Sequence, residues 1–158
     1  TYASACHVVL VEIDPATGQT CIEKYVIADD CGTRLNPASV EGQVQGGVAQ
    51  GTGTALYEEY CFDEFGNPQT ASYADYLMPT VFEVPMTEKH ALVTPSPNTA
   101  LGVKGTGEGA IHVTPGAIFC AVNDALEPLG VELTHANAKP ERVWSLIRQA
   151  TPGRVATS

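Results

Sequence analysis

A glycine-rich loop contains the residues of this sequence that are best suited to chemistry. Gly105, Gly107 and Gly109 are spaced two apart, and Glu108 lies between the last two of them. Lys104 stands four residues before that glutamate. Glycine lets a ligand approach main-chain N–H groups, and successive N–H groups form a concave site for an anion. A buried carboxylate has a raised pKa that suits a general base. The loop therefore predicts an anion-binding site beside a candidate general base. The alternative is a structural turn in which the glutamate is a solvated surface residue.

Known phosphate-binding fingerprints do not match this loop. Lys104 precedes the glycines, whereas the lysine of a P-loop follows them and is itself followed by Ser or Thr. The Gly-x-Gly-x-Gly spacing also lacks the later third glycine of a dinucleotide-binding turn. The five cysteines lie far apart with no CxxC pair, and the four histidines are scattered. We therefore expect no zinc or iron–sulfur site built from these side chains.

Composition and charge restrict the class of protein. The chain has 158 residues, of which 44% are hydrophobic and 16% charged, as expected for a single globular domain. Its formal net charge is −10 with only eight Lys and Arg residues, which argues against a nucleic-acid partner. No apolar run approaches the length of a membrane helix, and no signal peptide is visible. Reduced thiols in a cytoplasmic protein are the expected state of the cysteines.

The strands and helices that the sequence predicts around the loop form an α+β fold with a mixed sheet. Residues 6–13 carry Val and Leu on both faces, which predicts a buried strand, and the alternating residues 20–28 complete a β-hairpin. Residues 91–93 and 131–133 are predicted to be short strands. Three helices are expected to pack on the sheet: a long glycine-rich helix over residues 36–60, a second from Thr114 and Pro115 to about residue 127, and a third from Pro140.

The long helix is unusual because five glycines interrupt its apolar pattern. Each glycine inside a helix costs roughly 1 kcal/mol relative to alanine. Close packing on another backbone, or on a ligand, would compensate for that cost. Gln43 shares a helical face with Gly46 and Gly47. Its amide is suited equally to a polar ligand and to capping a buried carbonyl group, so both interpretations stay open.

The remaining acidic residues and the chain ends lead to further expectations. Two adjacent pairs, Asp29 with Asp30 and Glu58 with Glu59, are interpreted as solvated positions at element ends. Residues 1–150 are expected to form the domain and residues 151–158 a flexible tail. The chain starts at Thr1 and enters a strand pattern almost at once, which indicates a piece of a longer polypeptide. The isolated piece is then expected to expose apolar surface and to self-associate.

Four segments together resemble one enzyme family. They read DCGTRLNP at residues 30–37, EGQVQGGVAQGTG at residues 41–53, DYLMPT at residues 75–80 and GVKGTGE at residues 102–108. Their order and spacing resemble the C-terminal part of the molybdenum-binding large subunit of the xanthine dehydrogenase/aldehyde oxidase family. The carbon monoxide dehydrogenase large subunits are the nearest branch in this comparison, which covers almost the whole chain.

The resemblance implies a molybdenum hydroxylase that acts on an aldehyde, an N-heterocycle or carbon monoxide and takes oxygen from water. It implies a molybdenum–molybdopterin cofactor, in bacteria usually the cytosine dinucleotide form. By the same resemblance, Glu108 is the general base at the metal centre and Gln43 bonds the apical oxo group or the pterin. No side chain of this motif is implied to ligate the metal. The other implied cofactor contacts are largely main-chain groups of Gly46, Gly47, Lys104, Gly105, Thr106 and Gly107.

Departures from the family pattern leave other functions open. Residues 109–112 differ from the xanthine dehydrogenase type, and the family's substrate-selecting loops lie outside this sequence. The implied partners are the remainder of the large subunit and iron–sulfur and flavin subunits or domains, so the chain alone is expected to be inactive. One alternative is a non-catalytic assembly or binding module in which Glu108 is structural. Another is a phosphate- or nucleotide-binding domain without molybdenum.

Overall fold

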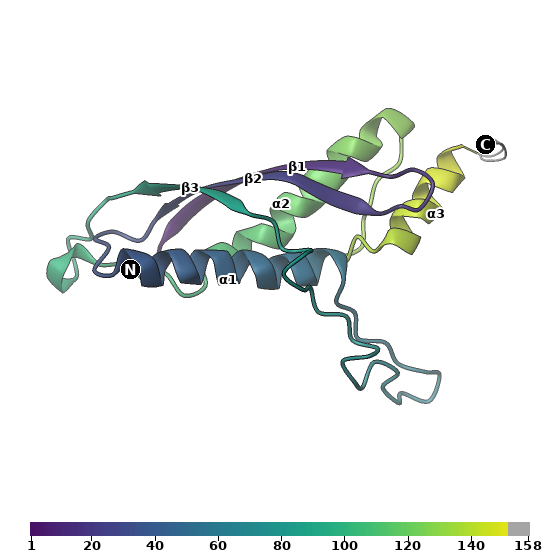
Figure 1. Cartoon of the computed structure of the whole chain (residues 1–158), viewed down its shortest axis with the longest axis horizontal. Coiled ribbons are helices and arrows are strands. Elements are labelled where there is room, and N and C mark those ends of the chain that lie inside the picture. The colour runs from purple at the N-terminus through teal and green to yellow at the C-terminus, as the bar shows by residue number, and fades with distance from the viewer. Residues whose placement is uncertain (152–158) are drawn as a thin grey trace.

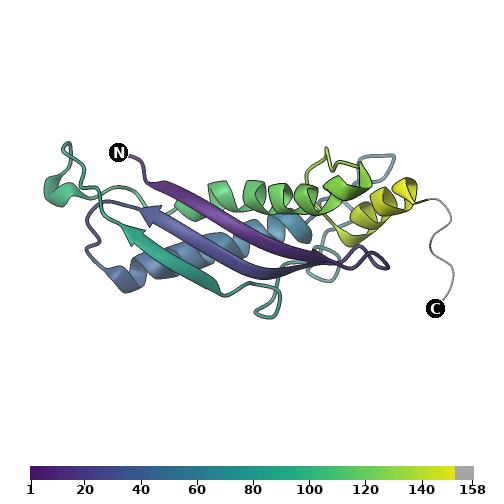
Figure 2. The ribbon, with the colours of Figure 1, turned by 90° about the horizontal axis from the view of Figure 1, so that it is seen from above.

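A computed structural model describes residues 1–151 as two layers, a three-stranded sheet and helices packed on one of its faces (Figures 1 and 2). The strands are β1 (Ser4–Ile13), β2 (Thr20–Asp30) and β3 (Thr87–Leu92), in the order β1-β2-β3. β1 and β2 are antiparallel, as the predicted hairpin requires, and β3 lies parallel to β2. The α+β prediction with a mixed sheet is confirmed.

Two strand predictions were wrong in detail. β1 is not buried on both sides: Val8 and Leu10 are 62% and 60% exposed, because helices cover only one face of the sheet. Residues 131–133 form no strand. There the main-chain N–H of Leu133 donates to Oδ1 of Asn123 at 2.7 Å, and the Asn123 amide donates back to the Leu133 carbonyl at 3.2 Å. A side chain thus replaces the strand partner that these residues lack.

The helices are α1 (Pro37–Leu56), α2 (Gly109–Leu126) and α3 (Pro140–Ala150), with single 3₁₀ turns at Ala100–Gly102 and Glu127–Leu129. α1 begins as predicted, because Oδ1 of Asn36 accepts the N–H of Ser39 at 3.2 Å. α2 begins before the predicted Thr114, so Pro115 lies inside it. Packing on α1 holds the turn before the proline in helical form. None of the described helices is long and apolar enough to span a membrane.

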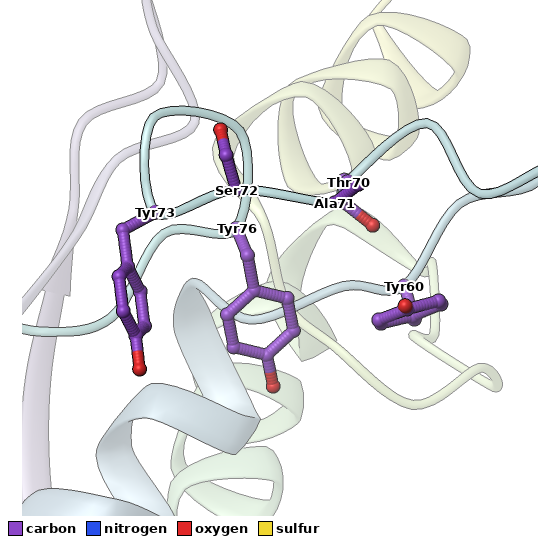
Figure 3. A pocket seen from close by; sticks show the side chains of 6 residues that line it. All are labelled: Tyr60, Thr70, Ala71, Ser72, Tyr73 and Tyr76. Carbon is purple, nitrogen blue, oxygen red and sulfur yellow. The ribbon is translucent and has the colours of Figure 1, made fainter.

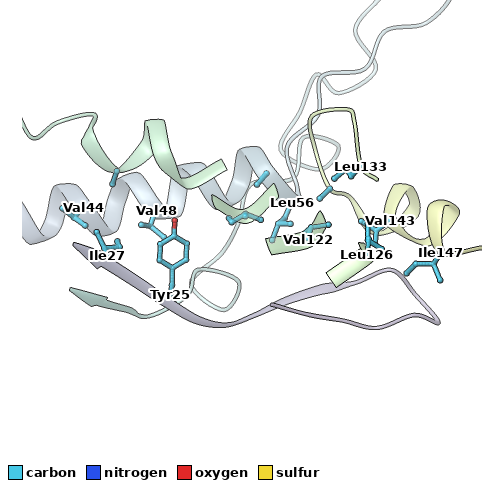
Figure 4. Close-up of a cluster of buried hydrophobic side chains, with 14 residues drawn as sticks. Tyr25, Ile27, Val44, Val48, Leu56, Val122, Leu126, Leu133, Val143 and Ile147 are labelled. Atoms are coloured by element: carbon cyan, nitrogen blue, oxygen red, sulfur yellow. The ribbon is translucent and has the colours of Figure 1, made fainter. Parts of the chain in front are cut away.

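Two glycines set the distance between α1 and α2. A Cβ atom added to Gly47 would lie 2.8 Å from the Ala110 Cβ, and one added to Gly51 would lie 2.4 Å from the Thr114 Cβ. Residue numbers increase in the same direction along both helices at these contacts, so α1 and α2 run parallel. The space between helices and sheet is filled by one cluster of buried side chains, including Tyr25, Val48 and others that Figure 4 labels. Close helix packing therefore explains two of the five glycines.

A long arm, defined here as residues 57–86, leaves the end of α1 and returns to β3. It contains no helix and no regular strand, and an isolated bridge between Phe62 and Pro68 joins two of its segments. In Figure 1 its outer part projects away from both layers. The predicted tail lies, apart from Thr151, outside the described residues.

Candidate functional site

Glu108 stands at the N-terminus of α2 with its side chain in the open. It is the residue that precedes the first turn of the helix, and its carboxylate makes no capping hydrogen bond. The side chain is 80% exposed, and Oε2 lies 3.8 Å from Nε2 of His112, one helical turn further on. The burial expected for a general base is therefore not supplied by residues 1–151. A bound group or another part of the protein would have to provide it.

Lys104 pairs with Asp30 and not with Glu108. Its Nζ lies 3.4 Å from Oδ1 of Asp30, and its side chain is only 14% exposed. Its main-chain N–H donates to the Cys31 carbonyl at 2.8 Å. Lys104 therefore ties the loop to the end of β2, and its ammonium group is committed to a buried partner.

Asp30 is a structural centre, and the prediction that it is solvated was wrong. Its Oδ1 accepts the main-chain N–H of Gly32 at 2.9 Å and of Thr94 at 3.1 Å, in addition to the Lys104 contact. Hydrogen bonds from Thr94 and Gly32, with help from Lys104, hold the pKa of Asp30 well below its usual range. One carboxylate thus joins three segments that are distant in sequence. An Asp two residues before a Gly is an Asx-turn signal, which was available in the sequence.

The other adjacent acids are partnered as well. Both carboxylate oxygens of Asp29 accept from Nη2 of Arg34, at 3.1 and 3.2 Å, and the two side chains are largely buried. Glu59 binds the cationic groups of Lys139 and Arg142 at 2.9 and 3.0 Å. The prediction of solvated positions was wrong, because each acid meets a partner that only folding brings close.

The loop crosses the end of β2 at two glycines with left-handed backbone angles. Gly32 has φ +69° and Gly102 has φ +70°. The Gly102 carbonyl accepts from the N–H groups of Thr33 at 3.1 Å and Ser96 at 3.0 Å. A Cβ atom on Gly32 would lie 2.3 Å from that carbonyl oxygen. This crossing fixes where the chain enters the Glu108 loop.

Beyond the crossing, the loop presents unused main-chain donors. Among residues 1–151, the N–H groups of Gly109, Ala110 and Ile111 make no hydrogen bond. A Cβ atom on Gly107 would meet nothing within 4 Å, so the backbone there is bare. A cavity of about 320 Å³ opens here, lined by residues 1–3, residues 105–109 and His112. Free donors at a helix N-terminus favour an anionic or strongly polar ligand.

The neighbouring surface of α1 contributes Gln43 and Gly46. Both residues are exposed, and a Cβ atom on Gly46 would meet nothing within 4 Å. They lie level with the start of α2, because Gly47 contacts Ala110. Gly47 itself faces α2, so helix packing accounts for its missing side chain. The described residues contain no group of three or more His, Cys, Asp or Glu side chains placed to hold a metal ion.

Comparison with known proteins identifies the fold. Residues 1–85 match the family described as the molybdopterin cofactor-binding domain. The chain belongs to this family. It is 44% identical over 142 residues to the nicotine 6-hydroxylase large subunit of Paenarthrobacter nicotinovorans, covering 90% of this chain and 17% of that protein. It is 37% identical over 150 residues to the carbon monoxide dehydrogenase large chain of Hydrogenophaga pseudoflava, covering 94% and 19%.

Solved structures agree with this assignment. Quinoline 2-oxidoreductase from Pseudomonas putida 86 matches with a TM-score of 0.88 and 43% identity, covering 90% of this chain and 18% of that one. Carbon monoxide dehydrogenase from Oligotropha carboxidovorans matches with a TM-score of 0.91 and 35% identity, covering 95% and 19%. The resemblance to molybdenum-binding large subunits is confirmed. This molybdopterin-binding domain spans less than a fifth of the length of these relatives.

The surface described above fits a cofactor of this kind. The unused N–H donors at the start of α2 suit its negatively charged groups, and the bare main chain at Gly46 and Gly107 allows a large planar group to come close. The site offers main-chain donors and one free carboxylate. Metal ligands would then have to come from the cofactor.

Proposed function

We propose that this domain forms one wall of the active site of a molybdenum hydroxylase and provides its general base, Glu108. The observation that carries the proposal is the free carboxylate of Glu108 beside three unused N–H groups, on the rim of an open cavity. The activities named for the relatives support oxidation of an N-heterocycle, an aldehyde or carbon monoxide.

The cofactor in this proposal is a molybdenum–molybdopterin, in the cytosine dinucleotide form. When bound, it supplies a two-electron oxidation with oxygen that derives from water. The N–H groups of Gly109, Ala110 and Ile111 would bind its polar groups, since they have no acceptor within residues 1–151. Main-chain groups of Gly105, Thr106 and Gly107 would line one side, and Gly46 with the Gln43 amide the other. Gly47, which faces α2, would set how close the two sides lie.

In this arrangement Glu108 performs the proton transfer. A carboxylate oxygen of Glu108 takes the proton from the attacking oxygen, and its freedom from any cap leaves both oxygens available. Lys104 acts as a positioning residue, because its contacts with Asp30 and Cys31 hold the loop in place. Cofactor and substrate would cover the exposed side chain and exclude water around it, which strengthens its interactions with developing charge.

The proposal extends to partners and location. Relatives are named as large subunits or as subunits of a complex, which supports partner chains; we propose that these carry iron–sulfur and flavin centres that remove the electrons. All five cysteines are free thiols, which is consistent with the proposed cytoplasmic location.

Replacement of the general base tests the proposal. In the full-length enzyme purified with its partners, Glu108→Gln should lower kcat by at least ~100-fold, since a general base contributes roughly two to four orders of magnitude. Molybdenum content, measured by elemental analysis, should stay near that of the unchanged enzyme. Glu132→Gln, at another exposed glutamate, serves as the matched control and should leave both unchanged.

The competing candidate is an assembly or binding module without catalysis. The 80% exposure of Glu108 is the observation that favours it. Full turnover by Glu108→Gln would establish this alternative, and absence of molybdenum from the purified unchanged complex would point to a nucleotide-binding domain instead. Loss of turnover with molybdenum retained supports the catalytic proposal.

A further inference from the structure

The arm, residues 57–86, is enriched in aromatic and acidic side chains compared with the rest of the chain. It holds seven of the chain's ten Tyr and Phe residues and both methionines. It also holds six acidic residues and none of the eight Lys and Arg residues. A segment with this composition is both strongly apolar and strongly negative.

These side chains point outward. Phe82 is 92% exposed, Met86 89%, Tyr73 84% and Phe65 81%. The outer part of the arm projects away from both layers of the domain (Figure 1). Aromatic residues and methionine are enriched at protein interfaces, and monomers rarely leave so many of them together in solvent.

The arm is nevertheless held in a defined shape. Asp63 organises its tip, because Oδ1 accepts the N–H groups of Phe65 at 2.9 Å and Asn67 at 2.8 Å. Next to the tip, the N–H of Gln69 donates to the Cys61 carbonyl at 2.8 Å. A surface that is already ordered loses less conformational entropy when it binds. The arm can therefore bind a surface outside residues 1–151 at a low entropic cost.

An aromatic pocket opens on the arm. Figure 3 shows Tyr60, Tyr73 and Tyr76 around it, with the chain at residues 70–72, and the cavity measures about 430 Å³. The rings of Tyr60 and Tyr76 lie 6.2 Å apart. The Tyr76 hydroxyl donates to Oε2 of Glu58 at 2.7 Å, which places a carboxylate beside the rings. Aromatic faces next to a negative charge attract a cationic group.

The occupant of this pocket is better explained as a side chain on a protein surface than as a free small molecule. Small-molecule sites usually enclose most of their ligand. Here Tyr73 is 84% exposed and Tyr60 57%, so the pocket encloses little. An arginine or lysine on a second protein surface would reach the pocket. The exposed apolar side chains of the arm would then pack against that surface.

We propose that the arm docks a separate polypeptide of the same complex through a basic, partly apolar surface, with an Arg or Lys side chain seated in the tyrosine pocket. A second copy of this chain is disfavoured, because its own arm carries the same six negative charges and its net charge is −10. Complementary charge chiefly serves the encounter of separate molecules, which favours another chain over a packed part of the same one. The inference does not depend on Glu108.

Zero-length carbodiimide cross-linking of the full-length protein, purified with its partner subunits, tests where the arm lies. Mass spectrometry should find Glu64 or Asp75 joined to lysines of another polypeptide in the complex. Cross-links only within the same polypeptide, or between two copies of it, would overturn the proposal. Purification of a single kind of polypeptide would overturn it as well.

Affinity measurements test the chemistry of the contact. Tyr73→Ala should weaken association with the partner by about tenfold or more, as expected for an aromatic anchor. Glu64→Lys should weaken it about threefold or more at low salt and progressively less at high salt. Glu132→Lys, an exposed position outside the arm, makes the same charge change and should have no such effect. Equal effects of the two charge changes, or unchanged affinity for Tyr73→Ala, would contradict the proposal.

Discussion

At the residue scale, the carboxylates of Asp30 and Glu108 lie on either side of the Gly32–Gly102 crossing, and their surroundings differ. Asp30 is buried and accepts from Gly32, Thr94 and Lys104, which keeps it charged and fixed. Glu108 is exposed and caps nothing. A carboxylate whose acceptor capacity is used holds structure together, whereas a free one remains available to take a proton. Asp30 therefore has a structural role, and we propose a catalytic role for Glu108.

The glycine crossing leads to a stability prediction. Gly32→Ala should destabilise the protein by about 3 kcal/mol, because a left-handed residue costs roughly 1–2 kcal/mol and the new Cβ meets the Gly102 carbonyl oxygen. Gly66→Ala is the matched control: it has φ +83° but no atom within 4 Å, so it should cost only about 1 kcal/mol. Chemical denaturation measures both. Equal losses would show that the crossing is not tight.

His7 predicts a dependence of stability on pH. Its Nδ1 lies 2.8 Å from the Tyr25 hydroxyl, which donates to Thr114 Oγ1 at 3.1 Å, and its Nε2 is buried without a partner among residues 1–151. Burial lowers the pKa of His7, against a smaller raising effect of Asp29, and burial raises the pKa of Tyr25 to about 12. Because the unfolded histidine binds its proton more readily, stability is complete above pH ~6.5 and falls as pH drops through the folded pKa.

Thermal unfolding between pH 7 and pH 5 measures this effect. The midpoint should fall by a few degrees, and His7→Gln should reduce the slope because glutamine does not titrate. Exposed carboxylates titrate below this window, so they contribute little to it. A flat midpoint in the unchanged protein would contradict the prediction.

At the element scale, four of the five glycines of α1 fall into two kinds. Gly47 and Gly51 lie against α2, where a Cβ atom would collide. Gly42 and Gly46 face open space, so nothing in residues 1–151 requires a glycine there. The stability cost of these two glycines is thus unexplained within residues 1–151. Gly46 lies on the same face as Gln43, level with the start of α2. Close approach of a bound cofactor would explain that cost.

Gly46→Ala separates helix stability from cofactor binding. It should stabilise the cofactor-free protein by roughly 1 kcal/mol, the usual difference between Ala and Gly in a helix. If the cofactor lies against this face, the same change should lower the molybdenum content of the purified enzyme. Gly116→Ala in α2 also meets nothing within 4 Å and is the control, with the same stabilisation and unchanged molybdenum. Full molybdenum content in Gly46→Ala would remove Gly46 from the proposed site.

At the scale of the whole molecule, apolar exposure and negative charge oppose one another. Large hydrophobic side chains stand in solvent on β1, on the arm and beside the loop crossing, yet the net charge is −10. Apolar surface favours association of copies, whereas like charge disfavours it.

The isolated chain should therefore self-associate weakly, and more strongly as salt screens the repulsion. Light scattering at about 50 and 500 mM NaCl checks this, since the screening length falls from over 10 Å to a few Å over that range. The expected trend is opposite to that for the arm and its basic partner, which salt should weaken. A monodisperse monomer at both concentrations would contradict the prediction.

Local chemistry allowed much of the fold to be predicted. The hairpin, the start of α1 at residues 36–37 and the start of α3 at Pro140 follow from a few adjacent residues, and the structure confirms them. Non-local pairing was less accessible. The third strand lies at Thr87–Leu92 because β2 offers it a parallel partner, and α2 begins at Gly109 because α1 supports its first turn.

The sequence by itself determined the hairpin turn and the starts of α1 and α3, since these depend on residues within a turn or two of one another. Only the tertiary structure decided that Asp30 is buried beside Lys104 and that Gly47 faces a helix while Gly46 faces open space. The physical reason is that burial and charge pairing depend on segments more than sixty residues apart in the chain, whose meeting no local pattern encodes.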